Sequence, residues 1–141
     1  MITFSRELTL HVGDHTFRMI HMPGHNTSQS AVVVENDGVV FTSDNVFCQC
    51  HTWLQEADPA AWLKTLDGLR ALAAETLVPG HGPVCDKGYL REQGAFIEEW
   101  VDYVRRGVDK GLAKDEAVAT LKMNVANLYD YVTGAGMHRR A

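Results

Sequence analysis

The sequence predicts one mixed α/β domain, in which a single, largely antiparallel or mixed sheet is covered by helices on one face. Two patterns predict this class: short apolar runs separated by turn residues fill the first half, and apolar residues at helical spacing dominate the second. The chain has 141 residues, 45% of them hydrophobic, and contains no linker or repeat. We therefore expect one domain over 1–141, with the sheet and site loops in 7–83 and a helical part in 86–133.

The first strands are predicted as two hairpins. Residues 7–22 alternate between apolar and polar side chains on either side of the turn dipeptide Gly13-Asp14. Residues 31–42 contain two runs rich in valine on either side of Asn36–Gly38. Because these two runs are apolar throughout, we expect them to form central strands.

A helix and a fifth strand follow. Asp58 and Pro59 are an N-cap and a first-turn proline, and leucines then recur at helical spacing, so a helix is predicted over 59–73. Residues 76–78 predict a short strand, which ends at a loop over 79–83 because that segment is rich in glycine and proline.

Helices fill the rest of the chain. A long helix is predicted from Asp86, with one apolar stripe formed by Leu90, Ile97, Val101, Val104 and Val108. Two shorter helices are expected over 114–122 and 125–132, and the glycines at 134 and 136 end the last one. The predicted order is thus four strands, a helix, a strand and then helices.

Composition argues against several classes of partner. The formal net charge is −5 and no basic stretch offsets it, so we expect no nucleic-acid partner. No segment approaches the ~20 apolar residues of a membrane helix, and residues 1–10 lack the pattern of a secretion signal. The odd count of three cysteines does not suggest a disulfide framework. These features favour a cytoplasmic location.

Three ionisable residues each follow an apolar strand closely: His25, Asp44 and His81. Imidazoles and carboxylates are suitable ligands for zinc, iron or manganese, and a glycine precedes each histidine, which lets the backbone turn sharply. Each residue alone is as easily a turn or cap residue. Because the arrangement recurs three times, we predict a shared metal site.

The ordered motifs Met22-Pro23-Gly24-His25, Phe41-Thr42-Ser43-Asp44 and Val78-Pro79-Gly80-His81-Gly82-Pro83 resemble the later motifs of the metallo-β-lactamase superfamily, over about residues 7–110. The resemblance implies half of a four-layer αββα sandwich. It also implies that His25 is the third histidine of a first metal position, that Asp44 bridges two metals, and that His81 is the last histidine of the second position. Ser43 stands where the family often has glycine, which restricts the loop.

One motif of the family is absent. The chain contains no His-x-His-x-Asp-His, which supplies the remaining ligands in that family. We therefore expect a C-terminal half with an incomplete site, holding one zinc or other divalent transition metal ion, or none. The resemblance leaves room for a partner chain that supplies the N-terminal half.

The half-sandwich has a consequence for association. One sheet face has no helices in the predicted arrangement, and its apolar side chains need a cover. We expect a homodimer through this uncovered face, which would bring no new kinds of ligand because both copies carry the same residues.

Two functions stay open. One is a metal-dependent hydrolase of unknown substrate, with His25, Asp44 and His81 as ligands. The other is a catalytically inactive, dimeric binding or scaffold domain or a truncated relic, and the absent motif favours inactivity for the isolated chain. A third idea is a redox or soft-metal role for Cys48, Cys50 and His51, for which ordinary loop thiols are the alternative. No catalytic residue beyond the metal ligands is identified.

Overall fold

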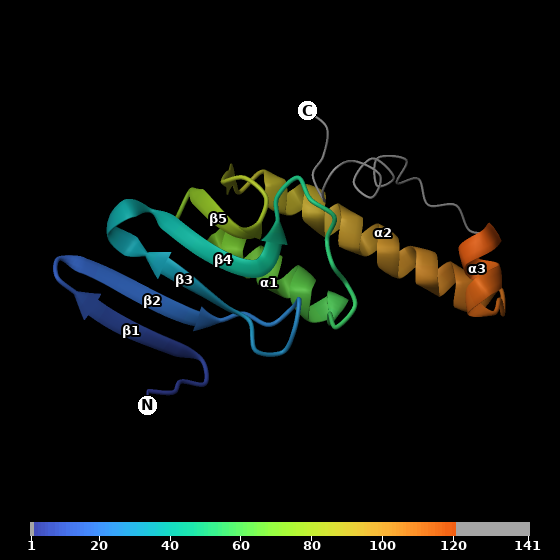
Figure 1. Ribbon diagram of the computed structural model, residues 1–141, viewed down its shortest axis with the longest axis horizontal. Helices are drawn as coiled ribbons and strands as arrows, with labels where there is room; N and C mark the ends of the chain where they lie inside the picture. Colours follow the sequence, from blue (N-terminus) through green and yellow to red (C-terminus); the bar gives the residue numbers. More distant parts are fainter. Residues whose placement is uncertain (1, 121–141) are drawn as a thin grey trace.

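The computed structural model describes residues 2–120 and shows one sheet with helices against it (Figure 1). The elements in chain order are β1 (Glu7–Val12), β2 (His15–His21), β3 (Ser30–Val34), the 3-10 turn η1 (Glu35–Asp37), β4 (Val39–Phe47), α1 (Pro59–Ala71), β5 (Thr76–His81), β6 (Cys85–Asp86), α2 (Tyr89–Asp109) and α3 (Lys114–Thr120). The predicted mixed α/β class is confirmed.

The six strands lie in the sheet in the order of the chain, β1 to β6. All neighbouring pairs are antiparallel except β4 and β5, which are parallel because α1 carries the chain back between them. Both predicted hairpins are present. The strand β6 was not predicted, since two residues give no periodicity to detect.

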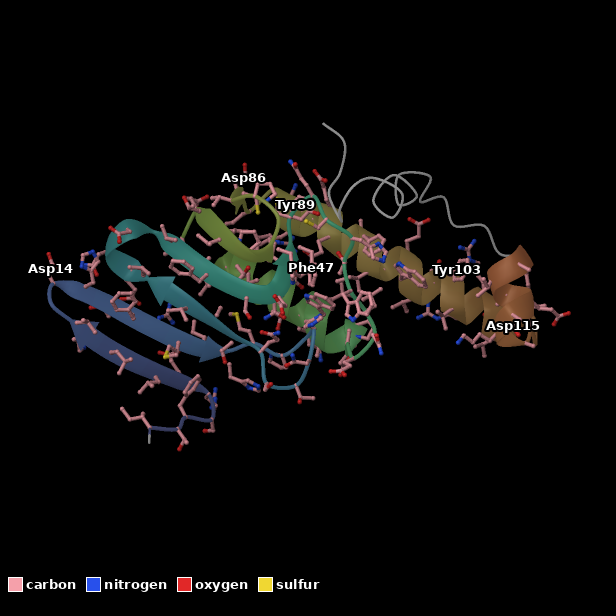
Figure 2. All side chains as sticks on the ribbon, viewed as in Figure 1. Asp14, Phe47, Asp86, Tyr89, Tyr103 and Asp115 are labelled. Carbon is pink, nitrogen blue, oxygen red and sulfur yellow. The ribbon has the colours of Figure 1, made fainter. Side chains whose placement is uncertain are left out.

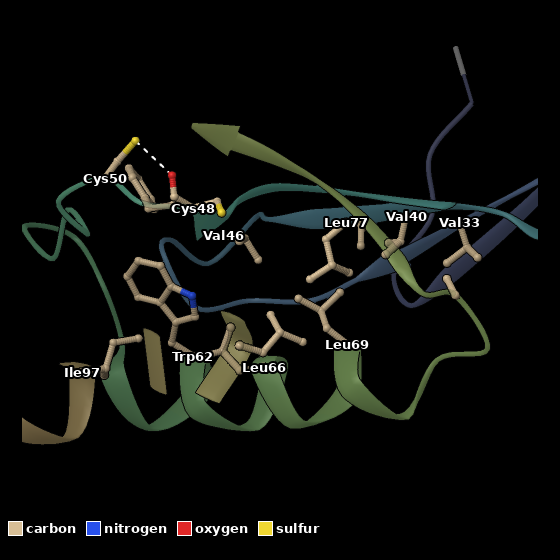
Figure 3. Packing of buried hydrophobic residues seen from close by; sticks show 14 residues of the cluster. Val33, Val40, Val46, Cys48, Cys50, Trp62, Leu66, Leu69, Leu77 and Ile97 are labelled. Atoms are coloured by element: carbon tan, nitrogen blue, oxygen red, sulfur yellow. Dashed lines mark hydrogen bonds between the residues drawn. The ribbon is translucent and has the colours of Figure 1, made fainter. Parts of the chain in front are cut away.

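The core lies between the sheet and α1 (Figure 3). The helix begins after Asp58, whose carboxylate accepts the backbone N–H of Ala61 and so caps the first turn. Its buried face carries Trp62, Leu66 and Leu69, which pack in one cluster with side chains of β3, β4 and β5: Val33, Val40 and Leu77. This layer confirms that helices cover one face of the sheet.

The long helix α2 differs from the prediction in two ways. It begins at Tyr89, because Asp86 belongs to β6 and its carboxylate accepts the backbone N–H of Gly88. Leu90 and Ile97 are fully buried, but Val104 and Val108 are 55% and 72% exposed, so the predicted stripe is wrong in its second half. The reason is that α2 continues past the sheet, where no described strand lies against it (Figure 1).

The remaining C-terminal expectations are only partly covered by the structure. Helix α3 matches the first of the two short predicted helices. The second, over 125–132, and the tail after it lie outside the described residues. Within residues 2–120, no helix has the length and apolar character needed to cross a membrane.

Candidate metal centre

Asp44 and His81 come together because β4 and β5 run parallel, so that their carboxyl ends meet at one edge of the sheet. The Asp44 Oδ1 and His81 Nε2 atoms are 3.5 Å apart. Both residues were expected on loops beyond their strands, and both lie within strands. The reason is that irregularities between Phe41 and Phe47 absorb extra residues, which lets β4 keep pairing with β5 as far as His81.

Ser43 adopts the backbone conformation that aims Asp44. Its φ angle is +53°, in the left-handed region where glycine is favoured. The side chain of Ser43 therefore restricts the backbone at a position where the fold requires a glycine-like φ. Its hydroxyl donates a hydrogen bond of 2.6 Å to the side-chain oxygen of Gln29, which is itself buried. This bond offsets part of the strain that a side chain suffers at this φ.

The glycines that precede the two histidines leave space for close packing. Gly24 lies in a bend, as expected, whereas Gly80 lies within β5, and neither residue has a positive φ. A Cβ atom at Gly80 would lie 2.1 Å from Asp44 Oδ1, and one at Gly24 would lie 2.8 Å from Trp62. Any larger residue at 80 would therefore displace the Asp44 carboxylate.

His25 is oriented by a backbone carbonyl. Its Nδ1 lies 3.1 Å from the carbonyl oxygen of Trp53, and a carbonyl can only accept, so this nitrogen carries the proton. This tautomer places the lone pair on Nε2, as in histidines that bind metals. The backbone N–H of His25 also lies 3.4 Å from the side-chain oxygen of Asn45, which ties this loop to β4.

The ring of Phe47 contacts both histidines (Figure 2 labels Phe47 at the end of β4). It stacks on His81 with ring centroids 4.7 Å apart and lies 5.6 Å from His25. Only 2% of Phe47 is exposed, so its ring is an anchored surface that fixes the plane of His81. Phe47 therefore belongs to the core and at the same time contacts two of the predicted ligands.

Two buried polar side chains that the sequence did not single out hold this part of β4. Gln93 of α2 accepts the backbone N–H of Phe47 at 2.9 Å and donates to the Asn45 carbonyl at 2.8 Å. The same carbonyl accepts the indole N–H of Trp62, and the Asn45 amide donates to the Met22 carbonyl. These bonds replace the ladder pairing that the irregular strand lacks. The available signal was a polar residue, Gln93, at a core position of an apolar helical stripe.

The donor pair fits part of a zinc site. Two ligands of a tetrahedral zinc ion, each bound at about 2.1 Å, lie roughly 3.4 Å apart, which matches the spacing of Asp44 and His81. Within residues 2–120, no third His, Cys, Asp or Glu completes a group of three with them. The described residues therefore supply two converging ligands, and His25 contacts the same Phe47 ring as His81.

The cysteine segment does not form a second centre in the described part of the chain. Cys48 and Cys50 are buried, and burial raises the pKa of both thiols. Burial also raises the pKa of the Cys85 thiol, which contacts Cys48. Raised pKa values keep the thiols protonated and so disfavour soft-metal binding, which agrees with the reading of these residues as ordinary thiols.

The chain is similar in sequence to known proteins. The family model described as "Metallo-beta-lactamase superfamily" matches residues 2–81. A linear primary-alkylsulfatase from a Pseudomonas species is 25% identical over 86% of this chain and 25% of its own length. A hydroxyacylglutathione hydrolase from Cupriavidus metallidurans is 35% identical over 59% of this chain and 30% of its own length. The chain thus spans well under half of these curated relatives.

Solved structures share the fold. A metallo-β-lactamase from Pontibacter korlensis aligns with a TM-score of 0.62 and 20% identity, over 68% of this chain and 47% of that one. An archaeal metallo-β-lactamase superfamily protein from Sulfolobus tokodaii aligns with a TM-score of 0.57 and 18% identity, over 67% of this chain and 38% of that one. At these identities the likeness shows the fold alone.

Proposed function

Because this chain belongs to the metallo-β-lactamase superfamily, we propose that it is a hydrolase module in which His25, Asp44 and His81 contribute ligands to a zinc site. The observation that carries the proposal is the separation of 3.5 Å between Asp44 Oδ1 and His81 Nε2, which suits two ligands of one ion. The remaining ligands are not among the described residues, so the proposed site is incomplete within this stretch of chain.

Each of the three residues is prepared for its proposed role by a neighbour. The Trp53 carbonyl holds the Nδ1 proton of His25 and leaves Nε2 as the donor atom. Phe47 stacks on His81 and limits rotation of that ring. Gly80 leaves the space that the Asp44 carboxylate occupies. Ligands that are held in place before binding lose less conformational entropy when an ion binds.

A zinc ion would supply a polarised, acidified water for attack on a carbonyl, phosphoryl or sulfuryl centre. The chain's own residues hold the donor atoms and give the site one wall, the buried Phe47 ring. The related alkylsulfatase and hydroxyacylglutathione hydrolase act on chemically different substrates by their names, so the proposal extends to hydrolysis and to no particular substrate.

The test is zinc binding by the full chain and by single variants at the proposed ligands. We expect up to one zinc per chain, with a Kd that rises at least about tenfold in Asp44→Asn and in His81→Gln, because each removes one of few ligands. His11→Gln is the control, since His11 is exposed on β1 and bonds only to Thr16 among described side chains. Equal zinc affinity in all four proteins would contradict the proposal.

The second candidate is a catalytically inactive binding or scaffold domain. The observation that favours it is that no group of three metal-binding side chains forms within residues 2–120. In that case the wild-type chain binds no zinc at about 100 μM metal, a concentration at which a site of micromolar affinity would be nearly saturated. The two ligand substitutions, Asp44→Asn and His81→Gln, then leave both metal content and stability unchanged.

A further inference from the structure

The loop that carries His25 has its two ends paired. It joins β2 to β3, and at its base the backbone N–H of Met22 donates to the carbonyl of Gln29 at 2.9 Å. A loop whose ends are bonded to each other is compact and is held in place through those ends. The position of His25 therefore depends on what holds Met22 and Gln29.

Both ends of this loop are bonded to β4, at the two residues that flank Asp44. The side-chain amide of Asn45 donates to the Met22 carbonyl at 2.7 Å. The hydroxyl of Ser43 donates to the side-chain oxygen of Gln29 at 2.6 Å. The chain neighbours of one proposed ligand thus hold the loop that carries another.

The bond to Gln29 supports Ser43 in a conformation that serine adopts only at a cost. The φ of Ser43 is +53°, and a residue with a Cβ atom persists in this region when its surroundings hold it there. Gln29 is only 8% exposed, so packing fixes its amide and makes it an immobile acceptor for the hydroxyl. The hydrogen bond therefore transmits the fixed position of Gln29 to the backbone of β4.

The backbone conformation of Ser43 sets the direction of the next side chain. The carboxylate of Asp44 faces His81, with Oδ1 3.5 Å from Nε2. Strand β5 packs closely against this part of β4, since an added Cβ atom at Gly80 would lie 2.8 Å from the Ser43 carbonyl carbon. A change of φ at Ser43 would rotate the planar peptide that leads into Asp44 and turn its carboxylate away from His81.

We propose that Gln29 is a positioning residue of the candidate metal centre. By holding Ser43 in the left-handed conformation, it keeps the Asp44 carboxylate against the ring of His81. The same hydrogen bond ties this part of β4 to the loop of His25. The consequence for zinc rests on the proposed function, whereas the placement of Asp44 against His81 is a property of the metal-free protein.

The experiment is a double-mutant cycle of Gln29→Leu and Ser43→Gly in the full chain, read first as zinc affinity. Gln29→Leu removes the acceptor, and we expect the zinc Kd to rise about tenfold, as is typical when a residue that orients a metal ligand is lost. Glycine adopts a φ near that of Ser43 without support from a side chain. In the Ser43→Gly background, Gln29→Leu should therefore change the Kd by less than about twofold.

The second readout is the proton–nitrogen NMR signals of the histidine rings in the metal-free protein. Gln29→Leu should shift the ring signals of His81, because the Asp44 carboxylate moves relative to that ring. The signals of His11, which lies on β1, should stay in place. In the Ser43→Gly background, Gln29→Leu should cause no further shift of the His81 signals. A wild-type chain that binds no zinc refutes the proposed function, and these signals still decide the role of Gln29.

Ser28→Ala is the matched control, because the Ser28 hydroxyl donates to Asn26 within the same loop. This variant keeps the wild-type zinc Kd and the wild-type His81 signals. Ser43→Ala serves if Gln29→Leu fails to fold. It keeps the Cβ atom and removes the hydroxyl, so it should raise the Kd and shift the His81 signals more than Ser43→Gly does.

Three results would overturn the proposal. One is an equal effect of Gln29→Leu in the wild-type and Ser43→Gly backgrounds, which would mean that Gln29 does not act through Ser43. Another is a set of His81 signals that Gln29→Leu leaves unchanged. The third is a Ser43→Ala variant that matches Ser43→Gly in both readouts.

Discussion

Gln93 is the residue by which α2 holds the metal-site end of β4, and Gln93→Leu tests that role. The substitution leaves the buried Phe47 N–H without an acceptor, which costs about 1–3 kcal/mol. The Asn45 carbonyl loses one bond but keeps the indole N–H of Trp62, so this loss adds only about 1 kcal/mol. We predict a total destabilisation of about 2–4 kcal/mol, or roughly 6–12 °C in Tm for a chain of this size.

The assay is urea and thermal unfolding, with Arg91→Leu on the exposed side of α2 as the control for helix effects. Gln93→Glu adds a second readout. It keeps an acceptor for Phe47 but sets a carboxylate oxygen against the Asn45 carbonyl unless the carboxyl is protonated, so the pKa of this introduced group is raised in the folded state. Stability then falls as pH rises from 5 to 8, more steeply than in wild type. A Gln93→Leu variant as stable as Arg91→Leu would refute the role of Gln93 in holding β4.

Three further predictions concern neighbouring features. Gly82→Ala is expected to destabilise the fold by about 3 kcal/mol or more, because the φ of Gly82 is +88° and the added Cβ would lie 1.7 Å from the Cys48 carbonyl oxygen. Gly13→Ala, at a residue with a positive φ but open space around it, costs only about 1 kcal/mol. Equal losses of stability for the two variants in thermal unfolding would contradict this prediction. Burial lowers the pKa of His51, so His51 is protonated in the unfolded chain before it is protonated in the folded chain, and stability falls as pH drops below about 6.5. In His51→Leu the midpoint of urea unfolding should depend less on pH in this range. An unchanged pH dependence would contradict the prediction. Cys48 and Cys50 should react slowly with a thiol reagent in the native protein and rapidly in denaturant, and fast native reaction of these two thiols would contradict their burial.

The sheet and α1 could be predicted because their signals are local. The turn dipeptide Gly13-Asp14 and the cap at Asp58 mark element boundaries in the sequence itself, and the structure has boundaries at both. The second half of α2 could not be predicted as exposed. Val104 and Val108 continue the helical periodicity, and only the length of the sheet determines whether such a stripe finds a partner.

For the candidate site, the sequence identified which residues lie at the edge of the sheet but not how they are held. The parallel pairing of β4 with β5 follows from the strand, helix and strand order, and it brings Asp44 to His81. The left-handed backbone conformation of Ser43 and the hydrogen bonds from Gln93 to β4 depend on tertiary contacts between distant segments. Hydrophobic periodicity does not predict such contacts. The signal for them in the sequence was Gln93, a polar residue at an apolar position of the helix.

The proposal that Asp44 and His81 hold a zinc ion is tested most directly by X-ray absorption at the zinc edge, on the wild-type chain loaded with one equivalent of metal. We predict nitrogen and oxygen neighbours at about 2.0–2.1 Å, with imidazole scattering that weakens in His81→Gln. A first shell with sulfur at about 2.3 Å would assign the metal to the cysteines, and a spectrum unchanged in His81→Gln would equally contradict the proposed site.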